Sequence, residues 1–417
     1  MGAIFGTLDV VFWGIITFSI LVVLHEGGHF LAARAFGVKV HEFMIGLPGP
    51  ALRLKTKNMT WGITAIPLGG YVRIAGMEPG AEDELLGAAL HAVATAGKLD
   101  AADLSRVLAV PRDRAAALLA TLEDWAAIVP VDEHAYETAD HVDRTADAAT
   151  MLDAARSITY RGLKTWKRIT VLVAGVAVNL LTAILVFTIV LSTFGTYRAS
   201  QSFATIEPGS PAAIAGLQPG DTLVSLDGEA LASWDEFLAA MSDTESGQTV
   251  TIGITRDGSP MSLSVTLAEK DGHGFLGVGP GAEKVRYTVF QAAGQAFTYT
   301  GMVFAAIVNF FRPSEFQQSV QSSRGVVGIA VMAADAAKAG PLDYAWLVAL
   351  LSLSLGAMNI LPIPPLDGGK VAVEVIERIA GRPLGRRFSL AVSAAGAVLL
   401  FSLIGYLMYA DVMRLVR

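Results

Sequence analysis

Four long apolar segments constrain the fold of this chain more than any other feature of its sequence. Each has close to or more than the roughly 20 residues that a helix needs to cross the core of a bilayer. The segments run from about Val10 to Ala33, from Ile169 to Phe194, from Tyr344 to Leu361 and from Phe388 to Ala410. Charged residues make up only 17% of the 417 residues, against about 25% in a typical soluble domain. The sequence therefore predicts a multi-pass α-helical membrane protein with four transmembrane helices.

The first segment has no basic stretch before it and no small-residue cleavage site, so we interpret it as a span and not as a signal peptide. Basic residues mark the cytoplasmic ends of spans. They form three clusters, which follow the first span, precede the second, and separate the third from the fourth: Arg34, Lys39, Arg53, Lys55 and Lys57; Arg161, Lys164, Lys167 and Arg168; Lys370, Arg378, Arg382, Arg386 and Arg387. With four spans, all three clusters are cytoplasmic and residues 195–343 lie outside. Arg414 and Arg417 oppose this orientation weakly.

The stretch Val289–Phe311 is an alternative fifth span, but a span there would invert the sidedness of all that follows. It also contains several Gln, Thr and Asn residues. We therefore expect an amphipathic helix that lies on the membrane surface.

Two histidines one helical turn apart, His25 and His29, lie inside the first apolar segment with Glu26 between them. This spacing lets both imidazoles reach one zinc ion, and the glutamate can act as a base toward water. The alternative, two histidines on a polar helix face, is unfavourable here because polar groups in a bilayer are costly unless they serve a purpose. The chain has no cysteine, so any metal must be bound by His, Asp or Glu.

A third ligand is expected from another span, because a catalytic zinc usually has three protein ligands and one open position. The third span ends in Pro362, Pro364 and Pro365, which break the helix, and Asp367 follows at once. Broken backbone at membrane depth is tolerated only beside protein or a polar cavity. Asp367 is therefore the candidate third ligand; the alternative is a solvated aspartate in a loop.

His-Glu-x-x-His in the first span, followed by Asn-x-x-Pro-x-Pro-x-Leu-Asp-Gly near the end of a later one, resembles the site-2 protease family. The similarity is greatest to bacterial regulated intramembrane proteases that contain PDZ domains. The resemblance implies zinc ligation by His25, His29 and Asp367, with Glu26 as the general base. It also implies that Asn359 orients the substrate or stabilises an oxyanion.

One departure from the family lies in the second span, which reads Ala-Gly-Val-Ala-Val-Asn over residues 174–179 where the family often has a proline. We interpret Asn179 as a residue that hydrogen-bonds between helices, in preference to a catalytic role.

Short alternating runs between the first two spans predict β-strands at Val40–Ile45, Ala51–Leu54, Thr60–Ile66 and Tyr71–Ile74, separated by glycines. Similar proteins have a membrane-associated β-hairpin sheet here, and an open sheet edge can bind an unwound substrate as an added strand. We therefore include Gly46 and Gly49 as candidate substrate-binding residues. A merely structural hairpin is the alternative. His41 has no motif partner, and we do not expect it to be a ligand.

Residues 200–283 resemble the PDZ modules of bacterial proteases. The stretch from Ala204 to Asp221 predicts a strand, a short helix and a Pro-Gly-Asp turn, followed by a strand to Gly228. Val250–Arg256 and Met261–Leu267 predict a hairpin across Asp257-Gly258. Residues 275–278 are the candidate strand beside the peptide groove.

The acidic residues of the chain, whose net charge is −7, are concentrated in an insert at 78–160. Helical runs at Glu84–Ala96, Ala101–Ala109 and Arg112–Ala126 precede a possible β-wing at Ala127–Glu137, an order that resembles a winged helix. DNA binding would need a basic surface, so we do not expect nucleic acid as a partner. A cytoplasmic regulator that binds the insert is the better prediction.

The resulting prediction has six parts: the first span with the zinc motif and β region (1–77), the insert (78–160), the second span (161–199), an extracytoplasmic PDZ domain (200–283), an amphipathic extracytoplasmic segment (284–341), and the third and fourth spans with the aspartate motif (342–417). We expect an intramembrane zinc metalloprotease of the bacterial inner membrane. Its substrates would be single-span membrane proteins, such as anti-sigma factors or remnant signal peptides. An inert scaffold and a metal transporter are the alternatives.

Overall fold

The computed structural model describes residues 2–56, 59–66, 69–77, 82–132, 134–270, 272–382 and 384–416. Lys57, Glu78 and Arg417, used in the sequence analysis, lie outside these residues, as do the side chains of Arg386 and Arg387. The chain forms two compact units, Met1–Phe187 with Ala293–Arg417, and Thr188–Ala292.

Four helices in the described part of the chain are long and apolar enough to cross a membrane, and they lie at the positions of the four expected spans. They are α1 (Gly2–Ala35), α6 (Thr165–Thr193), α12 (Pro341–Asn359) and α14 (Arg386–Val416). The third begins three residues earlier than the sequence predicts and ends two residues earlier, before the proline-rich loop. Pro341 stands at its first turn, where a missing amide hydrogen costs nothing.

The segment 284–341 has a helix at the expected position, Val289–Phe311, and two further helices that the sequence analysis did not identify. It contains α9 (Val289–Phe310), α10 (Phe316–Ser322) and α11 (Val326–Ala339). Helix α11 packs closely on α1, since a Cβ placed on Gly14 would lie 2.7 Å from Cβ of Ala330. The sequence analysis did not identify α11 because its packing rests on small residues, which give little periodic signal.

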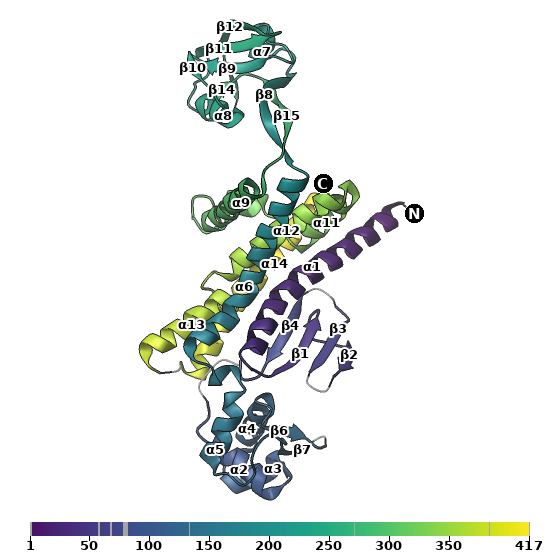
Figure 1. The fold of residues 1–417 in the computed structure, drawn as a ribbon, viewed down its shortest axis with the longest axis vertical. Helices are drawn as coiled ribbons and strands as arrows, with labels where there is room; N and C mark the ends of the chain where they lie inside the picture. The colour runs from purple at the N-terminus through teal and green to yellow at the C-terminus, as the bar shows by residue number, and fades with distance from the viewer. Residues whose placement is uncertain are drawn as a thin grey trace. The chain divides into compact units, whose positions relative to one another are not determined.

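The region between α1 and the insert is a four-stranded sheet of β1 (Val40–Ile45), β2 (Ala51–Lys55), β3 (Thr60–Thr64) and β4 (Gly70–Ile74). The strands match the predicted ones within two residues, but their arrangement is more than a hairpin. The order is β2-β3-β1-β4, and β1 pairs with β3 in parallel. Figure 1 shows the sheet beside the C-terminal half of α1.

The insert has its own hydrophobic core around Leu90, Leu104, Leu118 and Trp125, all fully buried. Its helices are α2 (Leu86–Ala96), α3 (Ala101–Leu108), α4 (Arg112–Asp124) and α5 (Ala148–Ser157), with a short 3₁₀ turn, η1 (Tyr160–Gly162). Strands β5 (Leu99–Asp100), β6 (Ile128–Pro130) and β7 (Ala135–Thr138) form a sheet in the order β5-β7-β6. The helical runs agree with those predicted; α5 and β5 were not predicted.

The unit Thr188–Ala292 packs a β-sheet on a core that includes Phe203, Trp234 and Ile252. The main strands follow the order β12-β11-β9-β8-β15. Their bounds are β8 (Thr196–Ile206), β9 (Thr222–Leu226), β10 (Glu229–Ala230), β11 (Thr249–Arg256), β12 (Ser259–Thr266), β13 (Ala268–Lys270), β14 (His273–Phe275) and β15 (Val278–Val285), with helices α7 (Pro211–Ile214) and α8 (Trp234–Ser242).

Two local predictions for this unit have different outcomes. The hairpin across Asp257-Gly258 is present: Arg256 pairs with Ser259, and both turn residues have positive φ, as an Asp-Gly turn requires. The expected strand at 275–278 is wrong. Strand β14 ends at Phe275 and β15 begins at Val278, because Gly277 between them has a φ of +82°.

Candidate metal centre

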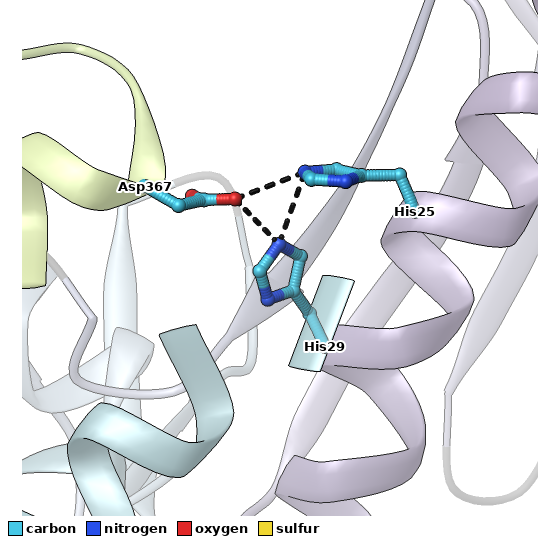
Figure 2. Close-up of side chains that lie close together, drawn as sticks. All are labelled: His25, His29 and Asp367. Atoms are coloured by element: carbon cyan, nitrogen blue, oxygen red, sulfur yellow. Dashed lines mark hydrogen bonds and ion pairs between the residues drawn. The ribbon is translucent and has the colours of Figure 1, made fainter. Parts of the chain in front are cut away.

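Three side chains from two distant helices meet at one point (Figure 2). His25 and His29 project from one face of α1, and Asp367 is the first residue of α13 (Asp367–Ala380). Oδ2 of Asp367 lies 2.9 Å from Nε2 of His25 and 3.0 Å from Nε2 of His29. The two Nε2 atoms are 3.3 Å apart. The structure thus brings together the three residues that the sequence analysis singled out as ligands.

The spacing and chemistry of these donors fit zinc. A tetrahedral zinc with ligands at about 2.0–2.1 Å has neighbouring donors about 3.3 Å apart, and the three donor atoms are 2.9 to 3.3 Å apart. Two imidazoles and one carboxylate leave a fourth position open for substrate or water. The residues are 8%, 4% and 5% exposed, in chain order. In the described part of the chain they are the only cluster of this kind.

The proline-rich loop between α12 and α13 positions Asp367, and this loop is packed tightly. A Cβ on Gly368 would lie 2.2 Å from the carbonyl oxygen of Ile360, and one on Gly369 would lie 2.3 Å from the nitrogen of Pro364. The two glycines therefore let α13 begin directly beside the end of α12. Nζ of Lys370 lies 3.1 Å from Oδ1 of Asp367, so the second carboxylate oxygen also has a partner.

Helix α6 supplies the surroundings of both histidines. Nδ1 of His29 donates to the carbonyl oxygen of Val171 at 2.7 Å, which leaves its Nε2 lone pair facing the cluster. The side-chain amide of Asn179 lies 3.3 Å from Nδ1 of His25. Residues 171, 175 and 179 share one face of α6 because they are four residues apart. This face of α6 therefore lies against the face of α1 that carries the two histidines.

A glycine pair allows the close approach of α1 and α6. A Cβ on Gly28 would lie 2.4 Å from the carbonyl oxygen of Ala174, and one on Gly175 would lie 2.4 Å from Nε2 of His29. Small residues at helix contacts allow such approach within membranes. The sequence analysis noted Asn179 but found neither Val171 nor the role of Gly175; their four-residue spacing was the available signal.

Glu26 lies on α1 between the two histidines and outside the donor cluster. Its Oε2 accepts the backbone N–H of Val72 in β4 at 3.0 Å. The sheet therefore holds the Glu26 carboxylate in place through this hydrogen bond. Glu26 is not a member of the donor cluster.

The other predicted site residues are not brought into the cluster. Asn359 is buried at the end of α12, and its Nδ2 donates to the carbonyl oxygen of Leu355 in the same helix. Gly46 ends β1 with a φ of +104°, and a Cβ there would lie 2.1 Å from Oγ1 of Thr64. Gly49 is exposed. Nε2 of His41 donates to the carbonyl oxygen of Asp124 at 2.7 Å, and His41 is not a member of the donor cluster.

Two solved PDZ domain structures match part of the chain. They belong to SdrC-like proteins of Listeria monocytogenes and Listeria innocua, with 24% and 22% identity and a TM-score of 0.19 each. They cover 20% and 21% of this chain and 88% and 99% of their own chains.

Relatives that match nearly the whole chain are metalloproteases by name. A protein of Mesorhizobium japonicum, whose name places it among the zinc metalloproteases, is 29% identical over 415 residues, covering 94% of this chain and 95% of its own. Metalloprotease MmpA of Caulobacter vibrioides is 28% identical over 420 residues, with shares of 94% and 92%. The sequence model of peptidase family M50 matches residues 13–403 of this chain. The chain therefore belongs to peptidase family M50, the site-2 protease family of zinc metalloproteases.

Proposed function

We propose that this zinc metalloprotease cleaves peptide bonds within the transmembrane segments of single-span membrane proteins. The observation that carries the proposal is the buried cluster of His25, His29 and Asp367, two of whose members lie in a helix apolar enough to span a bilayer. Charged and metal-binding groups at such depth are costly unless they act there. The substrate class includes anti-sigma factors and remnant signal peptides, as the sequence resemblance implies.

In this proposal His25, His29 and Asp367 hold the zinc ion. When bound, zinc polarises the scissile carbonyl and lowers the pKa of water. Glu26 takes a proton from the attacking water, whose oxygen adds to the carbonyl carbon. Glu26 then returns the proton to the leaving nitrogen as the C–N bond breaks. Because the backbone N–H of Val72 donates to Oε2 of Glu26, we assign the proton transfer to the other carboxylate oxygen, Oε1.

Substrate binding by strand addition is best placed at β4. Both β2 and β4 are outer strands of the sheet, and β4 is the one whose backbone is hydrogen-bonded to Glu26, through the N–H of Val72. Strands lie about 4.8 Å apart, so β2 is three strand spacings farther from the base. An unwound substrate paired with β4 would lie next to Glu26. The role of Asn359 in orienting the substrate or stabilising an oxyanion stays a prediction of the resemblance, and Gly46 and Gly49 as substrate contacts stay predictions of the sequence pattern.

We infer that the unit Thr188–Ala292 contains a PDZ domain and that the insert is a winged-helix-like module for a regulator. The hairpin at Asp257-Gly258 supports the first proposal, and the three helices α2, α3 and α4 at the predicted positions support the second. We further propose a bacterial inner-membrane location, with the PDZ domain outside and the insert in the cytoplasm. The chain has no cysteine, so a single cysteine can be introduced at either of the exposed positions Ala116 and Ser259. A thiol reagent that does not cross the membrane, applied to one side at a time, then reports the side on which each cysteine lies. Labelling of both from the same side would contradict this topology.

The catalytic proposal is tested by comparing wild type with Glu26→Gln on a single-span model substrate in membranes. We expect cleavage by wild type and loss of about 10²- to 10⁴-fold in the variant, because general-base catalysis contributes that much. Zinc content should be equal in both proteins. Loss of zinc from Glu26→Gln would contradict the assignment of Glu26 as base. A zinc-loaded wild type that cleaves no single-span substrate from a panel would contradict the proposed substrate class.

A further inference from the structure

Asn179 is the most completely buried polar side chain next to the metal cluster. It is 0% exposed, and it lies on α6 in an otherwise apolar stretch. Its Nδ2 is 3.3 Å from Nδ1 of His25. Its Oδ1 has no hydrogen-bond partner among the described residues. A buried amide oxygen without a partner is costly and calls for an explanation.

The chemistry of metal ligation supplies one. A histidine that binds a metal through Nε2 must carry its ring proton on Nδ1, and that proton needs an acceptor. His29 meets this requirement with the carbonyl oxygen of Val171. The group that faces Nδ1 of His25 is the amide of Asn179. An amide nitrogen can only donate there, whereas the amide oxygen can accept.

A half-turn of the amide resolves both problems at once. The oxygen and nitrogen of a side-chain amide are similar in shape, and the hydrogen-bond network decides which atom lies where. The half-turn places Oδ1 opposite Nδ1 of His25. The orphan oxygen then gains a donor, and the Nε2 lone pair of His25 points at the cluster.

We propose that Asn179 is the positioning residue of His25, and that its Oδ1 accepts the Nδ1–H of His25 when the site binds zinc. Helix α6 thereby sets the tautomer of both histidine ligands, by a backbone carbonyl for His29 and by a side chain for His25. The inference rests on zinc ligation by His25, and it concerns metal binding rather than the choice of substrate.

The fold fixes the amide where this role needs it. The backbone carbonyl of Asn179 accepts the hydroxyl hydrogen of Ser352 in α12 at 3.0 Å. A Cβ on Gly356, one turn further along α12, would lie 3.4 Å from Cβ of Asn179. Asn179 is therefore held from α12 on one side and contacts α1 on the other. A neutral amide also accepts a hydrogen bond without adding a second carboxylate beside Asp367.

The test measures zinc affinity by chelator competition in the purified full-length protein, with no substrate present. Asn179→Leu removes the acceptor at similar volume, and we expect about 10- to 100-fold weaker zinc binding, the usual effect of losing such a partner. Asn179→Asp keeps an acceptor oxygen and should bind zinc within a few-fold of wild type. Ser352→Ala is the comparison variant, because it removes the hydrogen bond to the backbone of Asn179 and spares the amide, and we expect it to lose less zinc affinity than Asn179→Leu.

Wild-type affinity in Asn179→Leu would overturn the proposal, as would equal losses in Asn179→Leu and Ser352→Ala. If Asn179→Leu fails to fold, the visible spectrum of the cobalt-substituted protein decides. Asn179→Asp should keep the spectrum of a four-coordinate site with two histidines, and Asn179→Ala should lose it or shift it. Identical spectra in wild type and Asn179→Ala would overturn the proposal. A wild type that binds zinc but cleaves nothing would count against the proposed function and leave this test unaffected.

Discussion

A single methyl group on Gly175 should disrupt the metal centre. The Cβ of an alanine there would lie 2.4 Å from Nε2 of His29 and 2.8 Å from the carbonyl oxygen of His25. Ordinary contacts of a Cβ begin at 3.4 Å, so the ligand nitrogen must yield by about 1.0 Å. The nearest neighbour is the His29 ring, which cannot move without losing its hydrogen bond to Val171, and the second neighbour is the backbone of His25. A displacement of about 1 Å can cost about 10²-fold in rate.

The assay compares Gly175→Ala with Gly27→Ala in α1, where an added Cβ would meet no atom within 4 Å. Both changes gain up to about 1 kcal/mol of helix propensity, so propensity cannot explain a difference between them. We expect Gly175→Ala to bind zinc at least tenfold more weakly and to cleave about 10²-fold more slowly. Gly27→Ala should match wild type. Unchanged zinc affinity and cleavage in Gly175→Ala would refute the close α1–α6 contact at the ligands.

Three further predictions test separate parts of the molecule. Asp367→Ala should reduce zinc affinity by orders of magnitude, measured by metal content after dialysis against chelator; full occupancy would remove Asp367 from the ligand set. Gly46→Ala should loosen the β1–β4 sheet, seen as faster amide exchange, while Gly49→Ala leaves exchange unchanged; slower cleavage by Gly49→Ala alone would support substrate binding there. The hydrogen bonds from Arg256 hold the pKa of Asp221, which is 1% exposed, below its usual range. Their stabilising effect is therefore present above about pH 4 and is lost as the pH falls through the lowered pKa of Asp221. Replacing Asp221 by alanine should lower the free energy of unfolding of this unit by about 3 kcal/mol. Amide exchange in β11, followed across this pH range, measures both effects.

Much of the fold followed from local sequence signals. The four spans appear because each is a continuous apolar run of the right length. The hairpin at Asp257-Gly258 forms because an aspartate and a glycine accept positive φ. Helix α2 of the insert ends before Gly97, and α3 ends three residues before Pro111. These features depend on neighbouring residues, so the sequence carries them directly.

The order of strands in the β1–β4 sheet did not follow from the sequence. Alternation predicted four strands, but nothing local shows that β3 lies between β2 and β1, or that β1 and β3 are parallel. Helix α11 was missed for a related reason, since its small residues serve close packing on α1 and carry no amphipathic pattern.

The sequence by itself determined the chemistry of this protein: a His-Glu-x-x-His motif in an apolar helix, an aspartate after a proline break, and no cysteine to compete as ligand. Only the tertiary structure brought Asp367 to within 3.0 Å of His29, placed Val72 against Glu26, and set Asn179 beside His25. The physical reason is that a helix face turned to lipid and one turned to another helix are both apolar. The hydrophobic pattern therefore does not tell which faces meet, and packing through glycines such as Gly28 and Gly175 decides it.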